Sequence, residues 1–180
     1  QFDEILEEIY VVEEHGESPE LGRIAMHGPA ALPLQMALER MQEMGLVTMK
    51  PHPPEQHAHK YVINPCHDSI AAAPDLPVDG SLVVEFTPKG KQKAVELIRR
   101  HRLAERLFTE SLGMMDEEEI EEQACKFEHI LSPEATERIC TFLGHPTTCP
   151  HGATIPPGEC CKRPARQNME LLFAANRARR

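Results

Sequence analysis

Two short segments of the chain hold metal-binding side chains at helical spacing. His101 and Glu105 lie four positions apart in RRHRLAERL, and Cys125, Glu128 and His129 follow an i, i+3, i+4 pattern in EEQACKFEHILS. On a helix, each spacing places its members on one stripe. Two such helices facing each other could offer imidazole, carboxylate and thiolate to one divalent ion. This donor set favours transition metals such as Fe(II), Co, Ni and Zn over Mg or Ca.

The second motif also has a purely structural interpretation. Short motifs occur by chance, so Cys125 could pack in a core while Glu128 and His129 face solvent. The second ligand-type helix just upstream favours a metal site over this alternative.

Bulk properties indicate a folded protein with a single core or two small ones. The chain has 180 residues, 41% hydrophobic content and no Trp, which predicts an aliphatic, Met-rich interior. It contains no apolar run of membrane-spanning length and no charged-then-apolar leader. We therefore expect a cytoplasmic protein without a membrane partner.

Cysteine usage and charge distribution narrow the class further. The six cysteines stand among ten histidines in a chain with helical patterning, which predicts reduced thiols, some of them metal ligands. The net charge is −10, yet residues 86–106 carry seven Lys and Arg against two acidic residues. Such segregation can give an acidic protein a basic face. A bound cation would also relieve repulsion among carboxylates.

The amino-terminal part has the outline of a winged helix. Apolar spacing predicts helices over 2–15 and 32–44, and Ser18-Pro19-Glu20 predicts a short helix over 19–27. LVTMK (46–50) and SLVVEF (81–86) are typical of strands. Between them, a Pro- and His-rich insertion at about 51–80 predicts a loop, either with incidental histidines or able to capture metal.

The carboxy-terminal part is predicted to be helical and then rich in turns. Helices are expected from about 87 to 111, 116 to 131 and 132 to 144, and a last short one at 168–178. Three cysteines of the turn-rich segment could hold zinc or an iron–sulfur cluster, together with nearby histidines, or remain thiols of an ordered tail. These cysteines are Cys149, Cys160 and Cys161, and the histidines are His145 and His151. The adjacency of Cys160 and Cys161 predicts strain if both bind one ion.

The stretches FTPKGKQKAVELIRRHRLAERLFTESLG and EEQACKFEHILSPEATERICTFLGHPTTCPHGATIP resemble the diphtheria-toxin-repressor family of metal-dependent transcriptional regulators. The match is dense over about 86–156 and thinner over 4–47, where ILEEIY, ELGRIA and ERMQEMGLV fit a winged helix. The resemblance implies a mainly α protein. It has a winged helix-turn-helix domain at 1–86 and a helical metal-binding and dimerisation domain at 87–144. A Pro- and Cys-rich tail follows at 145–180.

The resemblance also implies two metal sites. Cys125, Glu128 and His129 match the activating site, which Glu4 would complete in place of the Met of iron-type members or the Asp of manganese-type members. Glu7 falls where manganese-type members have a further carboxylate.

The second, ancillary site matches His101 and Glu105, with Glu121 in place of the histidine of iron-type members. We expect no ligands from a third, SH3-like domain. The mixed donor set predicts Fe(II) first and Mn(II) second.

The implied partners are double-stranded DNA with a palindromic operator and a second copy of the chain. In the expected recognition helix, LPLQMALERMQ, Gln35 and Arg40 are the candidate DNA contacts, and the usual Ser and Thr are largely absent. We therefore predict a metal-dependent homodimeric repressor of metal-homeostasis genes. The alternative is a metal- or redox-sensing protein with weak or redirected DNA binding. We do not expect an enzyme, because the sequence shows neither a nucleophile–base pairing nor a phosphate-binding loop.

A homodimer is also expected from the apolar stripe of the helices over 111–144, which is large for one small domain to hide. Its members are Ile120, Ala124, Phe127, Ile130, Leu131, Ile139 and Leu143.

Overall fold

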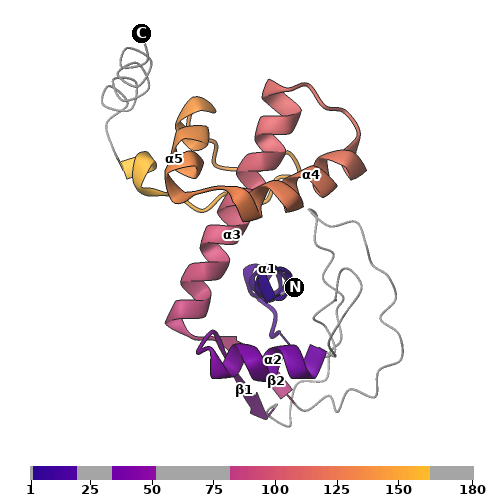
Figure 1. Cartoon of the computed structure of the whole chain (residues 1–180), viewed down its shortest axis with the longest axis vertical. Coiled ribbons are helices and arrows are strands. Elements are labelled where there is room, and N and C mark those ends of the chain that lie inside the picture. The colour runs from indigo at the N-terminus through magenta and orange to yellow at the C-terminus, as the bar shows by residue number, and fades with distance from the viewer. Residues whose placement is uncertain (1, 20–33, 52–81, 163–180) are drawn as a thin grey trace. The chain divides into compact units, whose positions relative to one another are not determined.

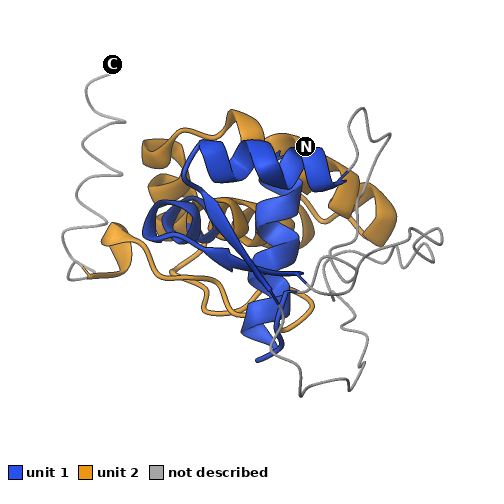
Figure 2. Cartoon of the chain, turned by 90° about the horizontal axis from the view of Figure 1, so that it is seen from below, with its two compact units in different colours: residues 1–95 blue, residues 96–180 orange. Residues whose placement is uncertain are grey.

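The computed structural model describes residues 2–19, 34–51 and 82–162 (Figure 1). The chain forms two compact units, residues 1–95 and 96–180, which are coloured separately in Figure 2. Within the described ranges, no helix is both long and apolar enough to cross a membrane.

The described part of the first unit contains two amphipathic helices, an antiparallel pair of strands and the beginning of the helix that follows them. Helix α1 spans Phe2–Glu14 and helix α2 spans Leu34–Glu43. Strands β1 (Val47–Pro51) and β2 (Leu82–Phe86) pair antiparallel, from Val47 opposite Phe86 to Pro51 opposite Leu82. The helices and strands are those predicted, within one or two residues at each end.

Apolar side chains at helical spacing form the core of this unit. Each of these residues, on both helices and on the strands, is at most 8% exposed. They are Ile5, Leu6, Ile9, Leu34, Ala37, Leu38, Met41, Val47 and Val84. The predicted helices at 19–27 and 168–178 and the insertion at 51–80 lie almost entirely outside the described residues.

Helix α3 (Pro88–Arg106) carries the first ligand motif. It begins two residues after the end of strand β2, at Pro88. Pro88 occupies the first turn, where its missing N–H costs nothing, and the backbone N–H of Gly90 donates to Thr87 Oγ1 at 3.0 Å. The helix continues as one π-helical turn, Leu107–Ser111, in which the Leu112 N–H donates to the Leu107 carbonyl at 3.1 Å. The predicted extent to 111 is thus reached with a wider last turn.

Helices α4 (Glu117–Ile130) and α5 (Pro133–Phe142) begin at the caps that the sequence predicts. Asp116 Oδ1 accepts from the Glu119 N–H at 3.0 Å, and Ser132 Oγ accepts from the Ala135 N–H at 3.2 Å. The apolar face of α4 packs on α3 and the turn after it. This core contains Ala104, Phe108, Ile120 and Ala124, with Met114 and Phe127 packed against it.

Residues 145–162 pack into the second unit instead of forming a separate tail. The Arg106 Nε–H donates to the Thr148 carbonyl at 2.5 Å, and Arg102 donates to the Thr154 carbonyl. Ile155 is buried, and a short 3-10 helix, Glu159–Lys162, contacts α5. Two arginines of α3 therefore donate hydrogen bonds to carbonyl groups of the loop. The turn-forming residues of this segment did not predict these contacts.

Candidate metal centre

The i, i+3, i+4 motif lies on α4 as predicted. One ligand atom from each of Cys125, Glu128 and His129 lies within 4.8 Å of the others. The Glu128 side chain is 0% exposed and that of His129 is 36% exposed. The alternative of a solvated Glu128 is therefore wrong, because this carboxylate is completely buried.

His101 and Glu105 on α3 face Glu121 on α4. Their ligand atoms also lie within 4.8 Å of one another, with His101 Nε2 3.4 Å from Glu121 Oε2. His101 is 2% exposed and Glu105 is 0% exposed. The facing-helix arrangement inferred from spacing alone is thus present in the second unit.

The side-chain pair His101–Glu128 joins these two predicted sites. His101 Nδ1 lies 2.9 Å from Glu128 Oε2, while the other oxygen of Glu128 lies 3.5 Å from His129 Nε2. An imidazole that donates one N–H to a carboxylate presents its other nitrogen in a fixed direction, as histidine ligands of metals do. With Nδ1 engaged by Glu128, Nε2 of His101 faces Glu121. We call the six residues of the two motifs the helical ligand group: His101, Glu105, Glu121, Cys125, Glu128 and His129.

Two residues from the loop after α5 reach Glu105. His151 Nδ1 lies 2.8 Å from Glu105 Oε1, and Cys149 offers its sulfur within 4.8 Å of both. Cys149 was predicted to group with Cys160 and Cys161, and this prediction is wrong, because its sulfur lies beside Glu105 and His151. Spacing could not reveal these contacts, although a buried cysteine in a polar loop was a weak signal.

Burial governs the electrostatics of this group. Desolvation raises the pKa of Glu105 to about 7, against the opposing charge of His101. Burial alone would lower the pKa of His151, but the charges of Glu105 and Cys149 raise it overall. Both oxygens of Glu105 and Oε1 of Glu128 are buried and accept no well-aligned hydrogen bond from the described part of the chain. Buried carboxylate oxygens of this kind fit a divalent cation, whose charge would favour their ionised form.

Glu4 and Glu7 lie three positions apart on α1, in the first unit. The candidate DNA contacts lie on the exposed face of α2. Gln35 donates from Nε2 to Glu39 Oε1 at 3.1 Å, and Arg40 forms an ion pair with Glu43 in which each side chain is 65% exposed.

Cys160 and Cys161 join two residues of the α5 end, Cys140 and His145, in a separate group. Cys140 was not predicted to join this group, because it lies within a helix about twenty residues before Cys160 and Cys161. Cys66 and the histidines of the insertion lie outside the described residues.

Comparison with known proteins agrees with this geometry. Residues 87–157 match the family model of the iron-dependent repressor metal-binding and dimerisation domain. The ligand-bearing helices thus form a domain of a class that binds metal and dimerises. The chain belongs to the diphtheria-toxin-repressor family, which confirms the resemblance found in the sequence.

Individual relatives show the extent of the similarity. The chain is 41% identical over 81 residues to the iron-dependent repressor IdeR of Mycobacterium leprae, covering 45% of this chain and 35% of that protein. It is 32% identical over 155 residues to the diphtheria toxin repressor of Corynebacterium efficiens, covering 84% of this chain and 53% of that protein. The chain therefore spans about a third to a half of the length of these relatives.

The fold is shared with solved structures of metal-dependent regulators. The manganese regulator SloR matches with a TM-score of 0.59 and 25% identity, over 87% of this chain and 60% of that one. The metal-dependent transcriptional regulator MtsR matches with a TM-score of 0.61 and 23% identity, over 87% and 59%.

Proposed function

We propose that this chain is a homodimeric transcriptional regulator that binds double-stranded DNA when Fe(II), or secondarily Mn(II), occupies its helical ligand group. It would repress metal-homeostasis genes. The observation that carries the proposal is the buried pair His101–Glu128, 2.9 Å apart, which joins two sets of metal-ligating side chains. Relatives named for iron and manganese dependence support the same conclusion.

The proposed first site consists of Cys125, Glu128 and His129, with Glu4 and Glu7 of α1 assigned to it from the family resemblance. A thiolate beside imidazole and carboxylates favours Fe(II) over harder ions, and the carboxylates keep Mn(II) as the second choice. Bound there, the ion would supply fixed positive charge among these side chains.

The proposed second site consists of His101, Glu105 and Glu121, to which the loop adds Cys149 and His151. Glu128 holds His101 Nδ1, so it orients an imidazole of the second site while belonging to the first. Filling either site should therefore favour filling the other. The reciprocal gain in affinity is a coupling free energy that titration can measure.

The proposed link to DNA is geometric. Two recognition helices of a symmetric dimer fit the half-sites of a palindromic operator only at one separation. Bound metal that fixes the separation of the two recognition helices would make the affinity for the operator depend on the metal concentration. Neutralised carboxylates would also repel phosphates less.

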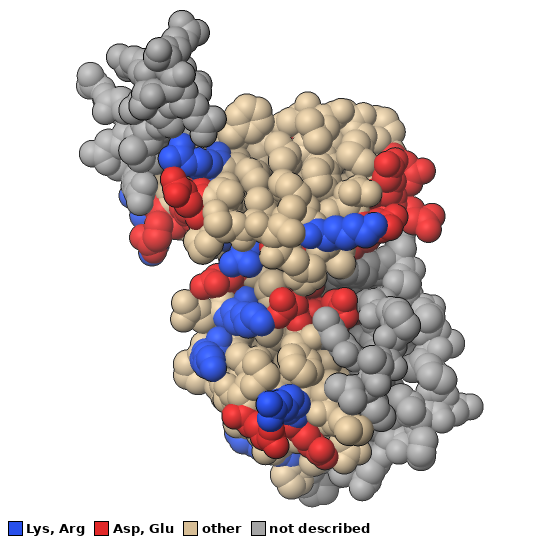
Figure 3. All heavy atoms as spheres, in the orientation of Figure 1, with Lys and Arg blue, Asp and Glu red and all other residues tan. Residues whose placement is uncertain are grey.

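A second candidate, a metal- or redox-sensing protein whose DNA reading is weak or redirected, is favoured by the surface of α2. On this helix, the candidate DNA contact Gln35 donates a hydrogen bond to Glu39, and the candidate contact Arg40 forms an ion pair with Glu43. Exposed ion pairs contribute only about 0–1 kcal/mol, so Arg40 can exchange its partner for a phosphate. On the face drawn in Figure 3, described basic side chains lie beside acidic ones rather than forming one continuous basic area.

Fluorescence anisotropy on the DNA upstream of the protein's own gene separates these candidates. We expect tight, salt-sensitive binding with Fe(II) under anaerobic conditions and at least ten-fold weaker binding without metal, on the order of the coupling typical of allosteric proteins. Calorimetric Fe(II) binding with no metal-dependent DNA binding would instead establish the second candidate.

The proposed dimer surface is smaller than the sequence suggested. Ile120, Ala124 and Leu131 are buried within the unit, whereas Ile130 and Phe142 remain 76% and 64% exposed. We propose that the exposed apolar side chains at the ends of α4 and α5 meet a second copy. Light scattering of the Ile130→Asp/Phe142→Asp double variant should then give a monomeric mass. An unchanged dimeric mass would refute this surface.

A further inference from the structure

The end of α5 and the 3-10 helix at Glu159–Lys162 bring together four side chains that the helical ligand group does not use. We call Cys140, His145, Cys160 and Cys161 the thiolate cluster. Cys140 Sγ lies 3.7 Å from Cys161 Sγ and 3.6 Å from His145 Nδ1. Cys160 Sγ lies 3.9 Å from Cys161 Sγ and 3.6 Å from His145 Nδ1. All four ligand atoms lie within 4.8 Å of one another.

These separations are those of the corners of a zinc tetrahedron. With Zn–S of about 2.3 Å and Zn–N of about 2.0–2.1 Å, tetrahedral geometry requires S···S of about 3.8 Å and S···N of about 3.6 Å. We propose that Cys140, His145, Cys160 and Cys161 form a structural Zn(II) site, distinct from the helical ligand group. Four protein ligands would fill the tetrahedron and leave no position for water or substrate, as in structural zinc sites.

The backbone at the end of α5 delivers the histidine. The Gly144 N–H donates to the Thr141 carbonyl at 3.1 Å, and the His145 N–H donates to the Cys140 carbonyl at 2.8 Å. This pair of bonds, with Gly144 at φ 77°, is a Schellman cap. His145 itself has φ 59°, an uncommon conformation for a residue with a side chain. The turn thereby returns the imidazole to Cys140, one helical turn before it.

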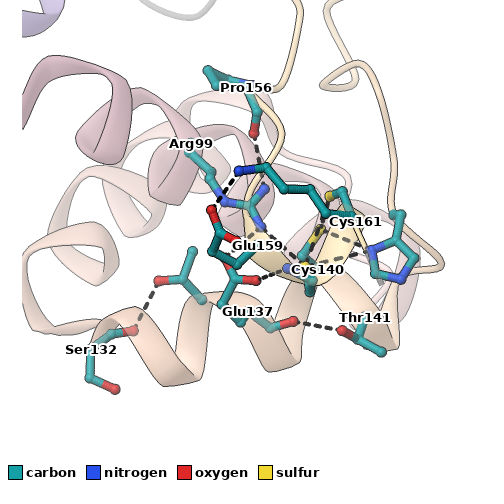
Figure 4. A network of polar contacts seen from close by, with 12 residues as sticks. Arg99, Ser132, Glu137, Cys140, Thr141, Pro156, Glu159 and Cys161 are labelled. Carbon is teal, nitrogen blue, oxygen red and sulfur yellow. Dashed lines mark hydrogen bonds and ion pairs between the residues drawn. The ribbon is translucent and has the colours of Figure 1, made fainter. Parts of the chain in front are cut away.

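The 3-10 helix solves the problem that adjacent cysteines pose. We expected Cys160 and Cys161 to be strained on one ion, yet their sulfur atoms are 3.9 Å apart, a separation that two corners of one tetrahedron require. Figure 4 shows Cys140 and Cys161 with their sulfur atoms turned toward the middle of this network.

A second layer of side chains suits an anionic metal site. Three thiolates and one Zn(II) leave one net negative charge, and Arg99 Nη2 donates to Cys160 Sγ at 3.4 Å. Glu137 holds Arg99 at 3.2 Å and accepts from the Cys160 backbone N–H. Arg99 also donates to the Pro156 carbonyl at 3.0 Å (Figure 4). Hydrogen bonds that fix ligands in this way are typical around bound metals.

Other fates of these cysteines fit less well. A disulfide would use two thiols and leave Cys140 or Cys160 beside His145 with no reason for four convergent donors. A two-iron cluster needs its ligand pairs separated by the length of the iron–sulfide core, whereas these four atoms fit around one ion. Fe(II) in a sensing role favours the carboxylate-containing group on α3 and α4.

The site would act as a clip on the loop that follows α5. Its ligands His145 and Cys160 flank residues 146–159, so the ion would close this segment into a ring and reduce its freedom in the unfolded chain. The same loop carries Cys149 and His151 to Glu105. Zinc would therefore hold in place the loop residues that reach the helical ligand group.

Metal analysis of the 180-residue chain, purified anaerobically under reducing conditions, tests the proposal. We expect one zinc per chain, and its loss in Cys161→Ser and His145→Ala. Replacement by Co(II) should give the intense near-ultraviolet bands of thiolate ligation and the visible bands of tetrahedral geometry. Cys125→Ser, which alters only the helical ligand group, is the matched control and should retain one zinc per chain and the Co(II) bands of the three-thiolate site.

The variant His145→Cys keeps the test decisive if the other variants fail to fold. It replaces one zinc ligand by another, so it should bind one zinc per chain with a four-thiolate Co(II) spectrum. The proposal is wrong if wild-type protein lacks zinc and shows no thiolate–Co(II) bands. It is equally wrong if Cys161→Ser keeps the full zinc content, or if peptide mapping of the anaerobic protein finds a Cys140–Cys161 disulfide. Because none of these readouts involves DNA, they are independent of the proposed regulatory function.

Discussion

The helical ligand group and the thiolate cluster lie in the same unit but differ in donors, burial and assembly. The first combines two histidines and three carboxylates with one cysteine, and two of its carboxylates, Glu105 and Glu128, are buried between facing helices. The second has three thiols and one histidine, gathered from a helix end and a 3-10 turn. Hard and borderline donors suit ions that exchange, whereas a closed set of thiolates suits an ion that stays. This difference is the basis of the division that we propose between sensing and structural support.

The largest effect that separates the two groups is expected from His129→Ala. Loss of a directly bound imidazole should lower Fe(II) affinity by on the order of 100-fold or more, beyond the 10–100-fold typical of outer residues. Zinc content should not change. Calorimetry and metal analysis measure both quantities, with Gln123→Ala on the same helix as control. Unchanged Fe(II) affinity would mean that His129 is not a ligand.

Arg99→Gln should produce the converse pattern. Removing the guanidinium leaves the Cys160 thiolate and Glu137 without their cation, so zinc affinity should fall by about 10–100-fold while Fe(II) affinity is kept. Competition with a chromophoric zinc chelator measures the change. Arg100→Gln, at the neighbouring position of α3, is the control. Equal zinc affinities for both variants would show that Arg99 does not support the cluster.

A smaller effect is expected where the loop meets the helical ligand group. His151→Ala should weaken metal binding at the second site by about 10-fold, the low end for residues that hold a metal ligand, because His151 contacts Glu105, and it should leave zinc in place. Calorimetry with Mn(II) can resolve the two sites, and Thr147→Ala in the same loop is the control. A loss at both sites would indicate stronger coupling through His101–Glu128 than we infer. No change at either site would mean that His151 does not support Glu105 in the second site.

The smallest effect concerns DNA. Replacing Arg40 with Ala should reduce the salt dependence of DNA binding by about one phosphate contact, and it should not alter either metal affinity. Anisotropy titrations over a range of salt concentrations give the slope. Lys126→Ala removes an equally exposed charge from α4 and should leave the slope unchanged. If both variants behave alike, Arg40 does not contact phosphate.

Local signals in the sequence predicted the helices and most of the helical ligand group. The caps Asp116 and Ser132 begin their helices as expected, because each cap involves residues only three positions apart. The motif on α4 could be predicted from the period of a helix alone, because that period places Cys125, Glu128 and His129 on one face.

What the sequence did not reveal depends on contacts between distant segments. Cys140 contacts Cys161, which is 21 positions later in the chain, and His151 contacts Glu105, which is 46 positions earlier. No periodicity links such pairs, because the packing of the loop on α3 and α5 decides them. The apolar stripe was misjudged for a related reason, since Ile120 and Ala124 are used within the unit itself.

Stepwise chelation of the Fe(II)- and zinc-loaded protein tests the division between sensing and structure most directly. A chelator of moderate strength is titrated while metal content and DNA anisotropy are recorded from the same samples. We predict that iron leaves first and that DNA binding is lost with it, while one zinc per chain remains and added Fe(II) restores binding. Release of zinc before iron, or DNA binding that survives complete loss of iron, would contradict the account.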